Sequence, residues 1–180
     1  MSKNPWETPN SPWKNKTAFF TYLRGCLRNS WSKNPIKLNL IKSERKQIEN
    51  PNPRGNKATV WGFTCAMCNK DFPIKDCQVD HINPVGKLNE KEDIQGFIER
   101  LLWVSDEDLR LCCKNCNMTL AYADRKNITF EEALLEKRII ALTKLPTEKQ
   151  IEMLTKYNLP CNNTKVRKES FTKLVKQGFS

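Results

Sequence analysis

The sequence predicts an α+β protein, mainly helical by content, with a small cysteine-rich centre between two basic helical extensions. Three observations predict this class. Apolar residues recur at helical spacing over much of the 180-residue chain. Short alternating runs typical of strands occur near the middle. Two Cys-x-x-Cys pairs enclose those runs. Because 38% of the residues are apolar, we expect one compact centre with appendages.

Basic residues are concentrated towards both ends of the chain, whose formal net charge is +11. Residues 1–57 contain 12 Lys/Arg and 3 Asp/Glu, residues 58–125 contain 8 and 11, and residues 126–180 contain 11 and 6. We treat these as an N-terminal arm, a centre and a C-terminal extension. The acidic centre suits a cation, and the basic ends suit the phosphates of a nucleic acid. Solubility alone would also explain lysine-rich ends.

No stretch of the sequence approaches the roughly 20 apolar residues that cross a bilayer, and the first residues lack the apolar segment of a signal peptide. We therefore expect a cytoplasmic protein with no membrane partner. The cytosol keeps thiols reduced, so the eight cysteines indicate a metal site rather than a disulfide framework.

Two helices are expected in the N-terminal arm. Ser11-Pro12 is a helix start signal, and apolar spacing extends the first helix to about Trp31. Asn34-Pro35 repeats the signal, and we expect a second helix that includes Ile48.

The stretch "NPNPRGNK", residues 50–57, is interpreted as a linker because helices and central strands exclude its prolines. Its basic residues, Arg54 and Lys57, are candidates to contact DNA. A plain hinge explains the segment equally well.

The centre is expected to contain two short strands, residues 77–82 and 108–112, joined by a connection with a helical insertion at about 88–104. A helix follows at 117–125. Thr129 and Glu132 form a capping box for another helix, to about Lys144. Further helices are expected from Thr147 and over 165–176.

Cys65, Cys68, Cys113 and Cys116 form the two Cys-x-x-Cys pairs. Two intervening residues let both sulfurs of a pair turn to one side, and two such knuckles complete a tetrahedral zinc site. Closed coordination by four thiolates has no open position for a substrate, so this Zn²⁺ would stabilise the fold. A redox dithiol is the alternative for either pair.

Cys112 adjoins Cys113, so the partner of Cys116 in the second pair must be chosen between these two cysteines. Because Cys113 has the two-residue spacing to Cys116, we interpret Cys112 as a buried thiol on the other face of the strand. Cys26, Cys77 and Cys161 stand apart and are interpreted as core or surface residues.

The centre also contains the only histidine in the chain, within "CQVDHINP", directly after Asp80. The order of segments along the chain is a cysteine knuckle, this strand, a long connection, the strand in "DLRLCCKNCN" and the second knuckle. The order resembles the HNH nuclease family, over residues 65 to 125. The resemblance implies a zinc-stabilised ββα-metal core and a divalent-metal-dependent DNA endonuclease. Short phage-encoded nucleases of this family, including homing enzymes, often carry similar basic arms.

By this resemblance, His81 is the general base that deprotonates a water, and Asp80 binds the catalytic Mg²⁺ or Mn²⁺. Asn117 falls where the family's final His or Asn binds the same ion. Carboxylate and amide oxygens are hard ligands suited to Mg²⁺, and a neutral imidazole can accept the proton. A lone histidine in a strand is otherwise most often a hydrogen-bonded core residue. Adjacent strand residues face opposite sides, so we expect the chain to bend at Asn83.

Asp108 departs from the family pattern because it stands at the position of the middle Asn. A carboxylate can accept the same hydrogen bonds and hold the imidazole tautomer, but it cannot donate. Reduced activity is one consequence. Arg110, Lys114 and Arg125 are candidates to bind DNA phosphates. Trp103 and Tyr122 are interpreted as packing residues rather than stacking platforms.

The sequence thus favours an endonuclease that cuts double-stranded DNA, in the host-cell cytoplasm if it is phage-encoded. One active site should nick one strand per protomer, so monomer and homodimer remain open. The rival interpretation is a zinc-ribbon nucleic-acid-binding protein without catalysis, and an RNA-directed nuclease is a third.

Overall fold

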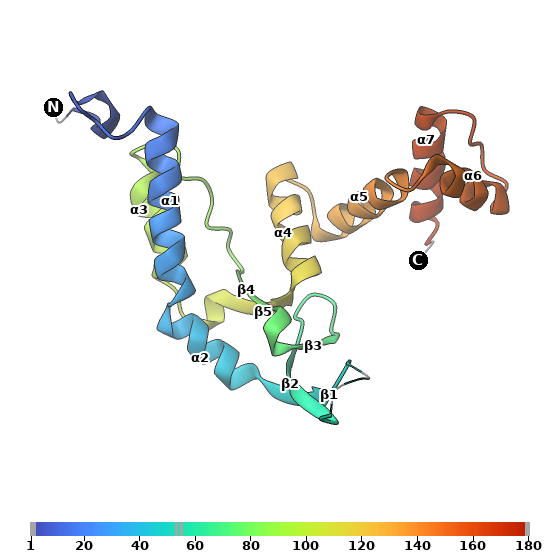
Figure 1. The fold of residues 1–180 in the computed structure, drawn as a ribbon, viewed down its shortest axis with the longest axis horizontal. Coiled ribbons are helices and arrows are strands. Elements are labelled where there is room, and N and C mark those ends of the chain that lie inside the picture. The colour runs from blue at the N-terminus through green and yellow to red at the C-terminus, as the bar shows by residue number, and fades with distance from the viewer. Residues whose placement is uncertain (1–2, 53, 55, 179–180) are drawn as a thin grey trace. The chain divides into compact units, whose positions relative to one another are not determined.

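The computed structural model describes residues 3–178 except 53 and 55 (Figure 1). The fold is α+β, with helices predominating and two small sheets, as the sequence predicts. Contacts divide the chain into two compact units, Met1–Cys116 and Asn117–Ser180. The division therefore falls within the helix that contains Cys116, the last cysteine of the second pair.

The first unit begins with a 3-10 turn, η1 (Pro5–Glu7), and helix α1 (Lys16–Ser32). The expected start at Ser11-Pro12 is wrong. The Asn15 side chain caps α1 by accepting a hydrogen bond from the Ala18 N–H. The Ser11 hydroxyl instead accepts from the Trp13 N–H, two residues on, which turns the chain before the helix.

Helix α2 (Pro35–Glu44) starts where predicted, because the Asn34 side chain accepts hydrogen bonds from two N–H groups of its first turn. It ends before Ile48, which the sequence had placed in the same helix. Ile48 lies in strand β1 (Lys46–Glu49), where its buried side chain packs over Gly62 of the neighbouring strand. A Cβ at Gly62 would lie 2.4 Å from the Ile48 Cδ1, so glycine leaves the space that this side chain fills.

Strands β1, β2 (Thr59–Thr64) and β3 (Asp71–Pro73) form an antiparallel sheet in that order. The predicted linker is therefore the loop of the β1–β2 hairpin. The Asn50 N–H and side chain donate to the carbonyls of Ala58 and Lys57, which closes the loop. Pro53 and Gly55, on which the linker prediction partly rested, lie outside the described residues.

A second sheet pairs β4 (Cys77–His81) with β5 (Leu109–Cys113) in antiparallel register. Both strands lie within a residue or two of the predicted positions. The 3-10 turns η2 (Ile74–Asp76) and η3 (Asp106–Asp108) precede them.

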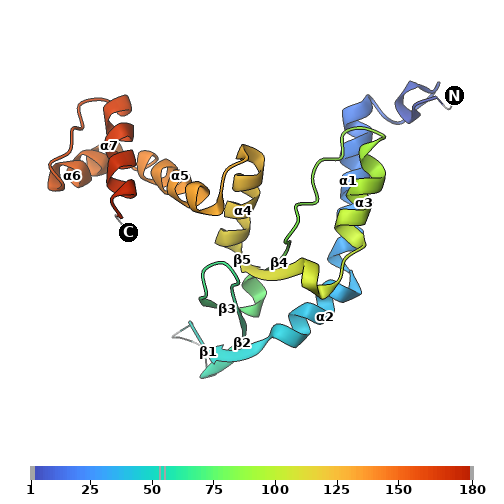
Figure 2. The same cartoon turned by 180° about the vertical axis from the view of Figure 1, so that it is seen from behind.

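Helix α3 (Asp93–Leu102) lies within the predicted insertion between these strands. It runs beside α1, as both views show (Figures 1 and 2). Phe20 of α1 and Phe97 and Leu101 of α3 are buried in one cluster with Leu88. The N-terminal arm and the insertion therefore share a core.

The second unit contains most of α4 (Lys114–Lys126) and three further helices, α5 (Phe130–Thr143), α6 (Thr147–Lys156) and α7 (Thr164–Lys176). The Thr129–Glu132 capping box is present, as predicted. Leu154, Phe171 and Leu174 form the core between α6 and α7. In the described part of the chain, no helix combines the length and the apolar character needed to cross a membrane.

Candidate metal centre and the pocket at His81

The four predicted cysteines converge on one point. The sulfurs of Cys65, Cys68, Cys113 and Cys116 all lie within 4.8 Å of one another. Four thiolates that bind Zn²⁺ at about 2.3 Å stand roughly 3.8 Å apart at tetrahedral corners. This cluster therefore fits a tetrahedral metal ion such as zinc.

Local backbone geometry builds the first knuckle. Asn69 adopts the left-handed conformation with φ of 53°, which an asparagine tolerates better than most residues. Its N–H donates to the Cys65 carbonyl, and the Cys65 N–H donates to the Lys70 carbonyl, both at 2.9 Å. The Ala66 N–H donates to the Leu111 carbonyl, so the knuckle is joined to β5.

Backbone N–H groups also point at the sulfurs. The Cys113 N–H donates to the Cys65 sulfur at 3.3 Å, and the Cys116 N–H donates to the Cys113 sulfur at 3.4 Å. Burial acts to raise the pKa of Cys65, but N–H groups of Cys113, Cys68 and Met67 outweigh it and lower that pKa to about 6. Part of the donor set is therefore predisposed to the thiolate form that binds metal.

Cys112 is fully buried and stays outside the cluster. Burial raises the pKa of its thiol to about 12, so it remains protonated and apolar. The sequence-based choice of Cys113 rather than Cys112 as the partner of Cys116 agrees with this geometry.

His81 ends strand β4, and two other elements hold its ring. The Nε2 atom lies 3.2 Å from the carbonyl oxygen of Leu101, at the end of α3. Because a carbonyl can only accept, Nε2 must carry a proton, and Nδ1 holds the lone pair of the neutral ring. The indole of Trp31, from α1, covers the imidazole with ring centroids 4.3 Å apart.

The surroundings of His81 favour its neutral form. Burial of the half-exposed ring lowers its pKa from the usual 6.5, against the opposing effects of the Leu101 carbonyl and the Asp80 charge. Neutral imidazole with a free lone pair is the state that a general base requires.

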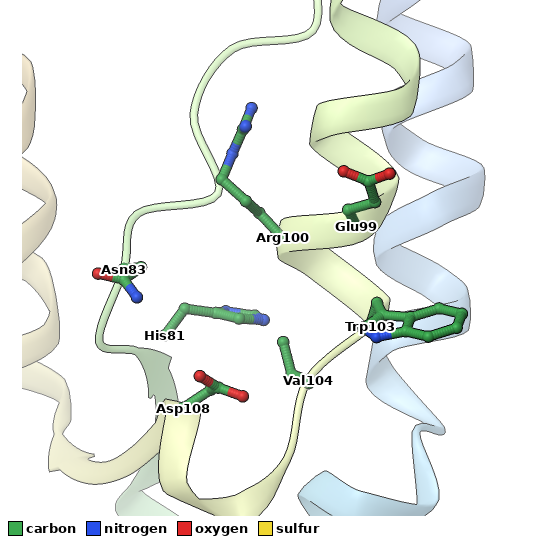
Figure 3. A pocket seen from close by; sticks show the side chains of 7 residues that line it. All are labelled: His81, Asn83, Glu99, Arg100, Trp103, Val104 and Asp108. Carbon is green, nitrogen blue, oxygen red and sulfur yellow. The ribbon is translucent and has the colours of Figure 1, made fainter.

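His81 lines a pocket of about 240 Å³ (Figure 3). Its walls come from the end of β4, the last turn of α3 and the segment before β5. They consist of His81, Asn83, Glu99, Arg100, Trp103, Val104 and Asp108. Arg100 is fixed there because its Nε donates to the Val85 carbonyl at 2.8 Å.

Asp108 lies beside His81 in this pocket, and its side chain accepts hydrogen bonds from Ser105. Its Oδ2 accepts from the Ser105 N–H at 2.8 Å and from the Ser105 hydroxyl at 2.9 Å. These bonds lower the pKa of Asp108, and the His81 ring contributes a little. The Asp108 carbonyl accepts from the Ile82 N–H. Asp108 therefore fastens the loop at the end of the two strands.

Asp80 is paired with Arg110 directly across the sheet. Both Nε and Nη2 of Arg110 contact Oδ2 of Asp80, at 2.9 and 2.8 Å. Strand pairing continues through His81, and the bend comes after it, at Ile82 and Asn83. Asp80 and His81 therefore alternate across the strand, and Asp80 is not among the residues that line the pocket.

The remaining predicted residues lie elsewhere. Asn117 is half-buried in the first turns of α4 and belongs to the second unit. Arg54 and Lys57 are exposed in the β1–β2 loop, Lys114 is exposed at the start of α4, and Arg125 is exposed near its end. Arg110 is half-buried because it pairs with Asp80.

Sequence reasoning gave no role at this site to Trp31, Arg100 or Trp103, nor to Glu99 and Val104 of the pocket wall. Helical spacing marked Trp31 as part of an apolar face but gave no partner for it. The interpretation of Trp103 as a packing residue is wrong, because its side chain is 87% exposed. The signal in the sequence for this exposure was the position of Trp103 directly after the last turn of a helix.

Comparison with family models, curated proteins and solved structures finds no match to this chain. The fold and the cysteine cluster define an α+β protein with a site that can hold a metal ion such as zinc. The function must therefore be argued from the pocket at His81.

Proposed function

We propose that this protein is a divalent-metal-dependent DNA endonuclease of the HNH, or ββα-metal, type. The observation that carries the proposal is the state of His81. Its Nε2 lies 3.2 Å from the Leu101 carbonyl, burial lowers its pKa and so favours the neutral ring, and it lines an open pocket. The sequence motif around His81 and the four-cysteine cluster support the same assignment.

In the proposed reaction, the substrate phosphate lies at the end of β4. Nδ1 of His81 takes a proton from a water molecule as the water oxygen attacks phosphorus. The bond between phosphorus and the 3′ oxygen breaks, and the 3′ oxygen leaves and takes a proton from solvent. The Leu101 carbonyl and the Trp31 indole hold the ring in one orientation during this transfer, which reduces the cost of alignment. Asp108 keeps the adjacent loop in place.

Asp80, in the first unit, is the residue that would hold the catalytic ion, and the role of Asn117, in the second unit, is a prediction from the motif alone. A hard cation such as Mg²⁺ or Mn²⁺ would stabilise the charge that develops on the phosphate and the leaving oxygen. Both contacts from Arg110 go to Oδ2 of Asp80. The second carboxylate oxygen is therefore outside this ion pair. Arg110 also competes with a cation for the same carboxylate.

A zinc-containing nucleic-acid-binding protein without catalysis is the second candidate. The Asp80–Arg110 pair favours it, because a carboxylate neutralised by arginine is a weaker ligand for Mg²⁺. In that case His81 and Asp80 would both be structural.

Nicking of supercoiled plasmid by the zinc-loaded protein tests the proposal. We expect wild type to nick in the presence of Mg²⁺ or Mn²⁺, and His81→Ala to lose at least about 100-fold in rate, the usual contribution of a general base. Zinc content and the thermal unfolding midpoint serve as controls for folding. Equal nicking by the variant would exclude His81 as the base.

Two further comparisons in this assay separate the DNA endonuclease from a binding protein and from an RNA-directed nuclease. A wild-type protein that binds DNA but never cuts it would favour the binding protein, and faster cleavage of structured RNA would favour an RNA-directed nuclease. Asp108→Asn, which provides the residue of the family pattern, should retain or raise the activity.

A further inference from the structure

Trp103 has a surface position that its chemistry does not favour. Among the large apolar side chains that the structure describes, none is more exposed than this indole, at 87%. Its backbone is nevertheless fixed, because the Trp103 N–H donates to the Glu99 carbonyl and caps α3. A rigid backbone that presents a bare indole to solvent is suited to contact with a partner.

Trp103 also stands between two hollows. One is the pocket of about 240 Å³ that contains His81 and Arg100. The other, of about 510 Å³, contains Leu102 and Ser105. Trp103, Val104 and Asp108 line both. Figure 3 shows the Trp103 indole directed away from the His81 ring, although the residue contributes to the wall of the pocket.

The lining of the second hollow limits what can occupy it. Beside Leu102, Trp103, Val104 and Ser105, the charged side chain in this lining is the Asp108 carboxylate. A second phosphate there would meet this carboxylate without a basic side chain to offset it, whereas a neutral, flat ring would carry no charge against it. A nucleobase has such a ring and stacks on aromatic side chains whatever its identity.

We propose that Trp103 stacks on an unpaired base adjacent to the phosphate bound at His81. A base within a regular duplex is covered on both faces by its neighbours and would have to be unstacked first. The preferred substrate class is therefore DNA with unstacked nucleotides, such as single strands, gaps and flaps. This inference rests on the proposed function for the position of the phosphate, but the stacking contact is a binding property.

Binding measured in the His81→Ala background without added Mg²⁺ or Mn²⁺, so that cleavage does not consume the DNA, tests the contact. Fluorescence anisotropy would compare a gapped oligonucleotide with an intact duplex of the same length. Adding Trp103→Ala should weaken binding to the gapped DNA about 10- to 100-fold, the loss expected for one base–aromatic stack. Binding to the intact duplex should change less than about twofold, because no base is free to stack.

Two matched variants separate stacking from general apolar contact. Trp103→Phe keeps an aromatic face and should restore most of the affinity. Trp103→Leu keeps the apolar surface without that face and should behave like Trp103→Ala. Wild-type affinity in the leucine variant, or equal losses on gapped DNA and duplex, would overturn the inference.

Photocrosslinking locates the contact without any use of activity. A gapped DNA with 5-iodouracil opposite the gap should crosslink to the peptide that contains Trp103. A crosslink to other residues only would overturn the inference. Absence of cleavage by wild type, together with a crosslink at Trp103, would reject the nuclease proposal and retain the stacking contact.

Discussion

At the scale of single residues, His81 is defined by contacts that the sequence does not reveal. The motif indicated a catalytic histidine and its aspartate neighbour. The Leu101 carbonyl and the Trp31 ring come from α3 and α1, which meet β4 only through tertiary packing. No local pattern specifies such partners. The cross-strand pairing of Asp80 with Arg110 was likewise hidden, because it depends on the strand register.

His81 is the only histidine in the chain, so its protonation can be followed as a single imidazole signal by NMR. We expect its pKa to lie below 6.5, because burial disfavours the charged ring. Trp31→Ala exposes the ring and should raise this pKa towards 6.5. Trp61→Ala, which removes an exposed indole from β2 outside the pocket, is the matched control and should leave the titration unchanged. A wild-type pKa above 6.5 would contradict the assigned environment.

The lowered pKa of His81 also makes the stability of the fold depend on pH. Because the folded-state pKa of His81 is lowered, its contribution to folding is fully present above pH 6.5 and is lost as the pH falls through the folded-state value.

At the scale of elements, the spacing of residues in the sequence predicted the structure correctly where a single local interaction determines it. The Thr129–Glu132 capping box and the two cysteine pairs are such cases. Spacing failed at Ile48, because an apolar residue near the end of a helix can equally begin a strand. The choice depended on Gly62, which opens space for the Ile48 side chain across the sheet.

The cysteine cluster should bind one Zn²⁺ per chain, and its metal should support the fold of the first unit. Structural zinc contributes on the order of 10 kcal/mol or more to small domains. Cys113→Ser should therefore lose zinc, measured by atomic absorption, and lower the unfolding midpoint. Cys112→Ala should keep zinc at the wild-type ratio. Loss of zinc from Cys112→Ala with retention of zinc in Cys113→Ser would show that Cys112, rather than Cys113, is the zinc ligand.

At the scale of the whole molecule, charge is the property most directly given by the sequence. The net charge of +11 predicts affinity for polyanions, and it does not depend on how the two units are arranged. Four of the five predicted phosphate contacts, Arg54 and Lys57 among them, are exposed, as such a role requires. Arg110 is held in an ion pair instead.

DNA binding should accordingly weaken steeply with salt. Six phosphate contacts would reduce the affinity about 1,000-fold between 50 and 200 mM salt. Arg54→Gln combined with Lys57→Gln should lower the slope of log affinity against log salt by about 2. Glu131→Gln with Glu148→Gln, at exposed acidic positions, provides a control of matched size. An unchanged slope in the basic double variant would remove the β1–β2 loop from the DNA interface.

The central claim is that His81 acts as a general base, and the nicking rate as a function of pH tests it most directly. Single-turnover nicking by the zinc-loaded protein would be measured with Mg²⁺ from about pH 5 to 8, the range in which histidine titrates. We predict that the rate falls as the pH decreases through the pKa found for His81 by NMR, below 6.5, and that His81→Ala lacks this step. A variant that nicks at the wild-type rate with the same pH profile would contradict the account.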